Sequence, residues 1–175
     1  GLIELWQERR PDLVLVLGDR GEMVAAALAA IHLGIHVGHI HGGELSGTLD
    51  ESFRHAISKM AHFHFVVSNE SKKRLIRMGE NPKNIWVVGA PGLVDIKKNF
   101  WRSSKSLKDQ YLLPNDADFY AIVVFHPVVQ EASDGANQIS QVLDALEREN
   151  CCGIILRPNS DAGGSAIDKV LDMVH

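Results

Sequence analysis

The chain has 175 residues, of which 45% are hydrophobic and 23% charged, and its formal net charge is −4. This composition is typical of a soluble globular protein, and the absence of excess positive charge argues against nucleic acid or an anionic membrane surface as a partner. No apolar run in the sequence is long enough to span a bilayer, so we expect no membrane association. Cys151 and Cys152 are adjacent and would point to opposite faces of a strand, so we expect buried free thiols, a reducing compartment and a cytoplasmic protein.

The first part of the chain predicts a strand, a helix and a second strand. Gly1 to Arg10 fits the tail of a helix, and the apolar run Leu13 to Leu17 is typical of a strand buried on both faces. Apolar residues then recur at helical spacing from Met23 to Ile31, and Ile35 to Ile40 forms the next apolar run. Two strands joined by a crossover helix form a parallel βαβ unit.

Alternation of strands and helices continues to the end of the chain. We expect further strands at 63–68, 85–88, 120–125 and 153–156, and further helices at 50–62, 70–78, 138–149 and 166–175, with Asp50 as the N-cap of its helix. The Lys- and Ser-rich segment 96–118 predicts a connection between a first domain at 1–95 and a second at 119–175. Because the sequence begins and ends within predicted helices, we expect it to be a fragment of a larger α/β protein.

Polar residues follow the first predicted strand. In open parallel sheets, ligands bind beyond the carboxyl ends of the strands, and Asp19 and Arg20 lie at that position. One interpretation is a helix cap beside a surface arginine. The other is a phosphate site that uses charged side chains, since the turn lacks a G-x-G-x-x-G pattern and arginine binds phosphate bidentately.

A second polar cluster follows the second predicted strand. It contains His39, His41, two glycines and Glu44. Alternate residues of a strand share a face, so we expect the two histidines to project together, while the glycines allow close approach of the backbone. This combination favours a functional site over two core histidines, and the lack of a third nearby ligand makes zinc a weak alternative.

Five further residues, at a helix start and after two later strands, extend the candidate site. Asp50 and Glu51 begin a helix whose N-terminus could bind an anion, with Arg54 one turn inside it, although capping alone would explain the two acids. His126 follows the first strand of the second domain, and Asn159 follows the next strand, where a role in turn formation is the alternative.

The sequence resembles the UDP-N-acetylglucosamine 2-epimerases, in particular the hydrolysing members that open sialic-acid and related nonulosonic-acid pathways. The matching motifs occur in the same order along nearly the whole chain: Gly18-Asp19-Arg20, His39-Ile40-His41-Gly42-Gly43-Glu44, Ser46-Gly47-Thr48-Leu49-Asp50-Glu51, Arg54-His55, Val88-Gly89-Ala90-Pro91, His126-Pro127 and Pro158-Asn159-Ser160-Asp161-Ala162-Gly163. Their conjunction is far more specific than any one of them.

The resemblance implies two Rossmann-like domains of the GT-B type, with parallel sheets and a nucleotide sugar between the domains, of which this chain is the middle portion. It implies the conversion of UDP-GlcNAc or a related UDP-HexNAc to a ManNAc-type sugar and UDP, by elimination to a glycal and hydration. No redox cofactor or metal is expected, and the partner is a UDP-sugar. We expect the fragment to be inactive alone and, because missing strands leave sheet edges, to associate with another copy.

Roles for individual residues also follow from the resemblance. Matching positions implicated in catalysis are Asp19, Asp50 and His126, and those assigned to substrate binding are Arg20, His39, Arg54 and Asn159. His41 stands where many members carry a glutamate, so the acid/base role there passes to His41 itself or to Glu44. The alternative functions are a non-hydrolysing epimerase, a GT-B glycosyltransferase and a nucleotide-sugar-binding module without turnover.

Overall fold

The computed structural model describes residues 1–94, 96, 104–114, 117, 119–159 and 162–174. The chain forms two compact units, Gly1–Asn99 and Phe100–His175, and each is described by itself. Much of the predicted connection at 96–118 lies outside the described residues, although helix α6 occupies Ser104–Gln110 within it. The exact domain boundaries therefore stay a prediction.

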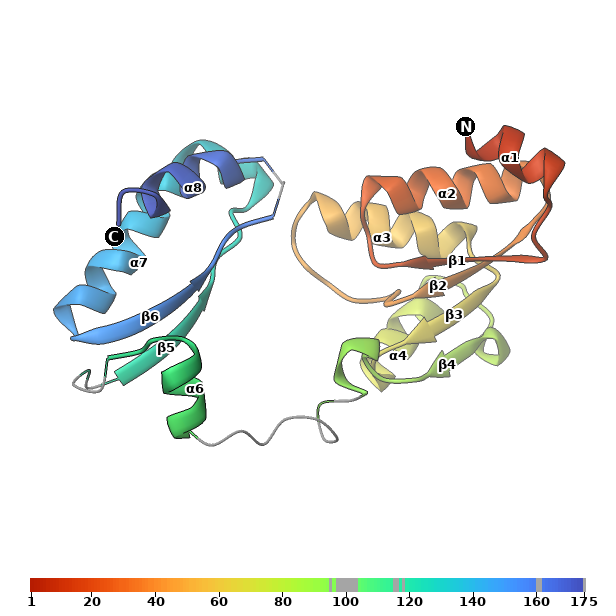
Figure 1. Ribbon diagram of the computed structural model, residues 1–175. Helices are drawn as coiled ribbons and strands as arrows, with labels where there is room; N and C mark the ends of the chain where they lie inside the picture. The colour runs from red at the N-terminus through yellow and green to blue at the C-terminus, as the bar shows by residue number, and fades with distance from the viewer. Residues whose placement is uncertain (95, 97–103, 115–116, 118, 160–161, 175) are drawn as a thin grey trace. The chain divides into compact units, whose positions relative to one another are not determined.

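The first unit contains one parallel sheet with strand order β1-β2-β3-β4 (Figure 1). Its elements are α1 (Leu2–Glu8), β1 (Leu13–Leu17), α2 (Gly21–His32), β2 (His36–Ile40), α3 (Leu49–Met60), β3 (Phe63–Val66), α4 (Asn69–Arg77), η1 (Pro82–Asn84), β4 (Ile85–Val87) and η2 (Pro91–Leu93). The predicted βαβ order is confirmed, and the strands begin and end within two residues of the predicted positions.

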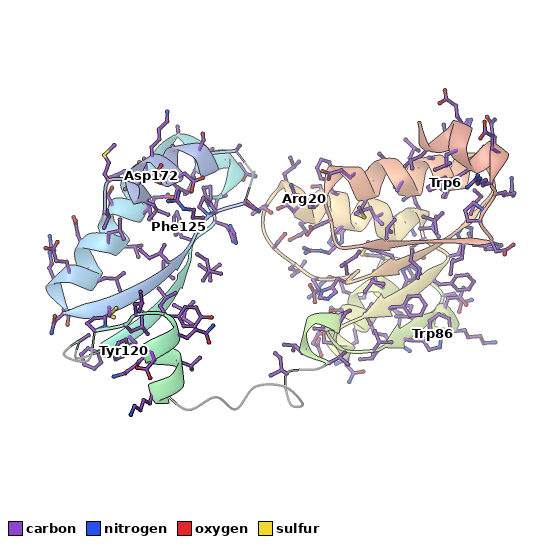
Figure 2. The ribbon with its side chains drawn as sticks, viewed as in Figure 1. Trp6, Arg20, Trp86, Tyr120, Phe125 and Asp172 are labelled. Atoms are coloured by element: carbon purple, nitrogen blue, oxygen red, sulfur yellow. The ribbon has the colours of Figure 1, made fainter. Side chains whose placement is uncertain are left out.

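One face of this sheet packs against helices. Val16 and Val37 of the strands are buried against Ala27 and Ala30 of α2 and Ile57 of α3. The small alanine side chains let α2 lie close to the strands, and burial of these apolar side chains supplies the main stabilisation of the unit. On the same side, Trp6 of α1, labelled in Figure 2, packs against the cluster, while Leu75 of α4 packs against β3 and β4.

The opposite face of the sheet is largely exposed in the described unit. Successive residues of a strand point to opposite faces, so Leu13, Leu15 and Leu17 point away from the helix-covered side that buries Val16. These three leucines and Trp86 of β4 are exposed. The prediction that the first strand is buried on both faces is therefore wrong for this chain, because an apolar run indicates a strand but not what covers it.

The second unit contains a two-stranded parallel sheet and helices. Its elements are α6 (Ser104–Gln110), β5 (Phe119–Val124), η3 (Val129–Asp134), α7 (Gly135–Arg148), β6 (Cys151–Leu156) and α8 (Gly164–Leu171). Ile139, Ile167 and Leu171 form its core, and Phe125, labelled in Figure 2, packs against them. This βαβα order agrees with the predicted elements.

The cysteines differ from expectation. Cys151 and Cys152 are free, as predicted, but both are partly exposed rather than buried, because β6 has only one neighbouring strand among the described residues. Among those residues, no helix combines the length and the apolar character needed to cross a membrane.

Candidate functional site

The carboxyl ends of β1 and β2 lie side by side. Leu17 pairs with Ile40, and the Gly18 amide donates to the Ile40 carbonyl at 3.0 Å. The segments that follow the two strands, Gly18-Asp19 after β1 and His41 after β2, therefore leave the sheet at the same edge. This arrangement confirms that the two predicted polar clusters share one end of the sheet.

Asp19 forms an ion pair with Arg54, which lies on α3 35 residues further along the chain. The pair is mostly enclosed, since the Arg54 side chain is 11% and the Asp19 side chain 20% exposed. Desolvation lowers the pKa of the Arg54 guanidinium, and within the described residues its Nε is buried without a hydrogen-bond partner. Buried donors without partners are rare in folded proteins, but His55 Nδ1 and His64 Nδ1 share this feature, so it does not by itself assign a role to Arg54.

His41 has an unusual backbone conformation. Its φ angle is +67°, in the left-handed region that few residues other than glycine adopt, although its amide still donates to the Phe65 carbonyl at 3.0 Å. The imidazole Nδ1 lies 3.4 Å from the Glu44 carboxylate, and about a third of each side chain is exposed. The left-handed backbone at His41 thus presents a His–carboxylate pair at the carboxyl end of β2.

The prediction that His39 and His41 project together is wrong. β2 ends at Ile40, and the left-handed turn at His41 breaks the strand alternation on which that prediction depended. The His39 side chain is instead fully buried on the helix-covered face of the sheet. The ring predicted to bind substrate thus has no exposed surface in the described unit.

The two glycines after His41 let the loop pack closely against helices. A Cβ on Gly42 would lie 2.9 Å from His39 Nδ1, and one on Gly43 would lie 2.5 Å from the Ser71 carbonyl oxygen. Arg74 of α4 also donates to the Gly43 carbonyl. The glycines thus fix the position of the loop that carries His41 and Glu44.

The start of α3 differs from the prediction. Its N-cap is Thr48 rather than Asp50, which lies inside the first turn and accepts a 3.4 Å hydrogen bond from the Thr48 hydroxyl. Glu51 accepts hydrogen bonds from the Ser46 and Gly47 amides, both at 2.8 Å, and these bonds lower the pKa of its carboxyl group. An acid in the first turn of a helix is the sequence signal for such a contact with the backbone that precedes the helix.

In the second unit, two candidates follow neighbouring strands. β5 and β6 pair in parallel, with Val124 opposite Leu156, so His126 and Asn159 both lie beyond carboxyl ends of the sheet. Both residues are exposed. Their strand-end positions agree with the prediction, whereas Asp161 of the matching motif lies outside the described residues.

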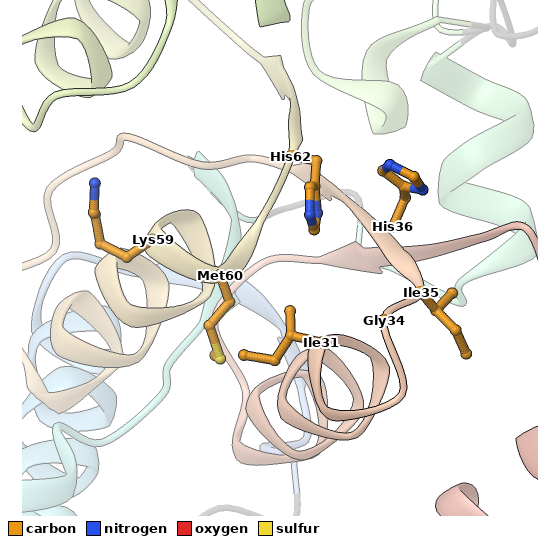
Figure 3. A pocket seen from close by; sticks show the side chains of 7 residues that line it. All are labelled: Ile31, Gly34, Ile35, His36, Lys59, Met60 and His62. Carbon is orange, nitrogen blue, oxygen red and sulfur yellow. The ribbon is translucent and has the colours of Figure 1, made fainter.

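A cavity of about 280 Å³ lies at the other end of the first sheet (Figure 3). Its lining includes His36, Lys59 and His62, close to the amino ends of β2 and β3. His62 Nδ1 accepts a hydrogen bond from the Val37 amide at 3.2 Å, which accounts for this histidine as a structural residue. The cavity is therefore separate from the candidate site at the carboxyl ends.

The family model of the UDP-N-acetylglucosamine 2-epimerases matches residues 1–175. The chain belongs to this family. A hydrolysing UDP-N,N'-diacetylbacillosamine 2-epimerase of Legionella pneumophila is 48% identical to this chain. The match covers 98% of this chain and 45% of the Legionella protein. A hydrolysing GDP/UDP-N,N'-diacetylbacillosamine 2-epimerase of Campylobacter jejuni is 32% identical, over 96% of this chain and 44% of the Campylobacter protein. The chain thus spans less than half the length of these relatives.

Solved epimerase structures share the fold of this family member. The UDP-GlcNAc 2-epimerase of Neisseria meningitidis, solved with UDP-GlcNAc bound, is 22% identical with a TM-score of 0.74, over 99% of this chain and 50% of its own. The Methanocaldococcus jannaschii enzyme, solved with UDP-GlcNAc and UDP, is 19% identical with a TM-score of 0.73. This match covers 98% of this chain and 49% of the Methanocaldococcus chain. The predicted α/β class with Rossmann-like parallel sheets, present here as part of a larger fold, is confirmed.

Proposed function

We propose that the full-length protein is a hydrolysing 2-epimerase that converts a UDP-linked 2-acetamido sugar to the free 2-epimer and UDP. The observation that carries this proposal is the edge of the first sheet, where a His41–Glu44 pair and an Asp19–Arg54 pair follow adjacent strands. Membership of the epimerase family and the 48% identity to a hydrolysing relative support the same reaction.

The proposed reaction has two steps. In the first, a base removes the proton from C2 while the bond from C1 to the diphosphate oxygen breaks, which releases UDP and leaves a C1–C2 double bond. In the second, an acid returns a proton to C2 from the opposite face, and water adds its hydroxyl group to C1 while a base takes the remaining proton of the water. The chemistry requires two acid/base groups and a positive group near the departing diphosphate.

We assign these duties to the residues at the strand ends. The His41–Glu44 pair supplies an acid/base group in place of the glutamate that many family members carry, because the carboxylate lies 3.4 Å from the imidazole Nδ1 and can orient the ring. Asp19 is the second group, held by Arg54. Asp50 and His126 contribute to the proton transfers, and Arg20 and Asn159 contribute to binding of the nucleotide.

Names of the relatives suggest two sugars to test. The Legionella and Campylobacter relatives are named for N,N'-diacetylbacillosamine nucleotides, whereas other relatives, such as that of Neisseria meningitidis at 39% identity, are named for UDP-GlcNAc. Both sugars carry an acetamido group on C2, the carbon whose configuration the reaction inverts. We propose a UDP-2-acetamido sugar as the substrate class, with the diacetylated sugar as the first candidate.

The test is to incubate the full-length protein with each UDP-sugar and identify the products by proton NMR. We expect free UDP and a free 2-epimeric sugar in equal amounts. A UDP-linked epimer would instead indicate a non-hydrolysing epimerase, and sugar transfer to an added acceptor would indicate a glycosyltransferase. UDP-sugar binding without any product would leave a binding module and overturn the proposal.

Variants then test the residue assignments. Asp19→Asn and His126→Gln should each lower kcat by at least about 100-fold while UDP binding is retained. His36→Gln serves as the control, because His36 is exposed near the amino ends of the strands, at the cavity in Figure 3. Unchanged turnover in Asp19→Asn or His126→Gln would contradict that residue's catalytic role.

Three broader expectations remain proposals. We propose that the reaction opens a sialic-acid or related nonulosonic-acid pathway, since a relative from Escherichia coli, 34% identical over 163 residues, is named a polysialic acid biosynthesis protein. We also propose a cytoplasmic location and a homo-oligomer, which fractionation of cells and light scattering of the purified full-length protein would test.

A further inference from the structure

His39 is a fully buried histidine that forms hydrogen bonds with the residue after β1 and with α3. It lies on β2 between Val16 of β1 and His64 of β3, on the face covered by α2 and α3. Its Nε2 lies 2.8 Å from the Gly18 carbonyl oxygen, and its Nδ1 lies 3.0 Å from the Ser58 hydroxyl on α3. One ring therefore links the end of β1 to α3.

The chemistry of the partners fixes the protonation of the ring. Burial lowers the pKa of His39 to about 4, so the imidazole is neutral near pH 7. A carbonyl oxygen can only accept, so Nε2 carries the proton and donates to Gly18, and Nδ1 accepts from the Ser58 hydroxyl. Both ring nitrogens are thus satisfied without a ligand.

The partners of His39 adjoin the proposed catalytic groups. Gly18 immediately precedes Asp19, and Ser58 lies four residues after Arg54 on the same helix, which places the two side chains on one face of α3. Gly42, the neighbour of His41, packs against both members of the bridge, since a Cβ there would lie 2.9 Å from His39 Nδ1 and 3.0 Å from Ser58 Oγ. A shift of the ring would therefore move the groups on which the reaction depends.

We infer that His39 and Ser58 form a buried bridge that positions Asp19 against Arg54 and does not touch the substrate. The inference rests on the proposed function for its effect on turnover, and on the hydrogen bonds for its geometry. Both residues are positioning residues, because they act through Gly18 and through α3. Ser58 is not among the sequence-predicted site residues, and only its contact with the ring reveals it.

Two substitutions of the ring separate its hydrogen bonds. In His39→Gln the amide nitrogen occupies the region of Nε2 and can still donate to Gly18, whereas in His39→Asn the shorter amide reaches only the Nδ1 region and Ser58. His64→Asn is the matched control, since His64 is equally buried on the same face but pairs with Glu80 at 3.3 Å.

The kinetic test uses the full-length protein with a UDP-sugar that it turns over. His39→Asn should lower kcat by about 100-fold, and His39→Gln by about tenfold, because the bond to Gly18 sets the position of Asp19. KM should change by less than about threefold in both, since neither removes a substrate contact. Equal losses in the two variants, a change mainly in KM, or the same loss in His64→Asn would overturn the inference.

A second measurement does not depend on turnover. Exchange of the Arg54 guanidinium protons with solvent, followed by NMR, should accelerate at least about tenfold in Ser58→Ala and His39→Asn but not in His64→Asn. Unchanged exchange in Ser58→Ala, a small substitution with little effect on folding, would overturn the bridge. If the wild-type protein releases no UDP from any sugar, the proposed function fails, while this exchange experiment still decides the bridge.

Discussion

Removing Arg54 tests how strongly the structure depends on the Asp19–Arg54 pair. Arg54→Met keeps an unbranched apolar stem but removes the guanidinium group, and it leaves the Asp19 carboxylate, only 20% exposed, without its partner. Losing one member of a fully buried ion pair destabilises a protein by about 3–5 kcal/mol, and losing an exposed pair by about 0–1 kcal/mol. Because the two side chains are only 11% and 20% exposed, we expect Arg54→Met to lower the free energy of unfolding by about 2–4 kcal/mol, close to the value for a fully buried pair.

The assay is urea unfolding of the full-length protein at pH 7, with Asp19→Asn and the double variant completing a double-mutant cycle. We expect a coupling free energy of about 2 kcal/mol, because the double variant leaves no buried charge unpaired. Lys73→Met is the control, since the Lys73–Glu70 pair is 60% and 70% exposed and should contribute less than about 0.5 kcal/mol. A coupling below about 0.5 kcal/mol for Asp19 and Arg54 would refute the reasoning from burial.

Three other predictions concern the loop between β2 and α3. His41→Gly should raise the free energy of unfolding, measured by urea unfolding, by about 1 kcal/mol, because glycine adopts the left-handed backbone without strain. The same variant should lower kcat, measured by NMR, at least about 100-fold, because it removes the imidazole. Glu51→Ala should be less stable than wild type at pH 7. Because the pKa of Glu51 is depressed in the folded state, this difference in stability should shrink as the pH falls below the ordinary carboxyl pKa of 4.5. Urea unfolding from pH 7 to pH 3 measures the difference, and one that persists unchanged at pH 3 would contradict the prediction. Gly43→Ala should lower the free energy of unfolding by about 2–4 kcal/mol, since the new Cβ would meet the Ser71 carbonyl oxygen. Gly47→Ala has a similar φ but open space around the Cβ, so it should lower the free energy of unfolding by only about 1 kcal/mol. Equal shifts of the thermal unfolding midpoint in the two variants would count against the packing argument.

Local patterns predicted the elements of the fold well. The apolar run at Leu13 to Leu17 became β1 with the predicted bounds, because a run of Val and Leu stopped by Gly18 has few alternatives in a parallel sheet. What covers a strand is a long-range property, so the exposure of Leu15 could not be predicted from the run itself. The N-cap at Thr48 rather than Asp50 shows a similar limit, since both residue types cap helices and the loop contacts decide between them.

The candidate site was predicted in part. Topology placed Asp19 and His41 at one edge of the sheet, as the register of β1 and β2 confirms. The separation of His39 from His41 depends on a single left-handed residue after the strand, which no alternation pattern contains. The Arg54 ion pair and the Ser58 bond join residues 35 and 19 positions from their partners, so only the folded chain reveals them.

The central claim is that the reaction breaks and remakes the C2–H bond while UDP leaves. The most direct measurement is to run the reaction of the full-length protein in deuterated water and examine the released sugar by proton NMR and mass spectrometry. Elimination followed by hydration predicts a free 2-epimeric sugar that carries one deuterium at C2, formed together with UDP. A released sugar of unchanged C2 configuration that retains its C2 proton would mean simple hydrolysis of the sugar–phosphate bond and would contradict the account.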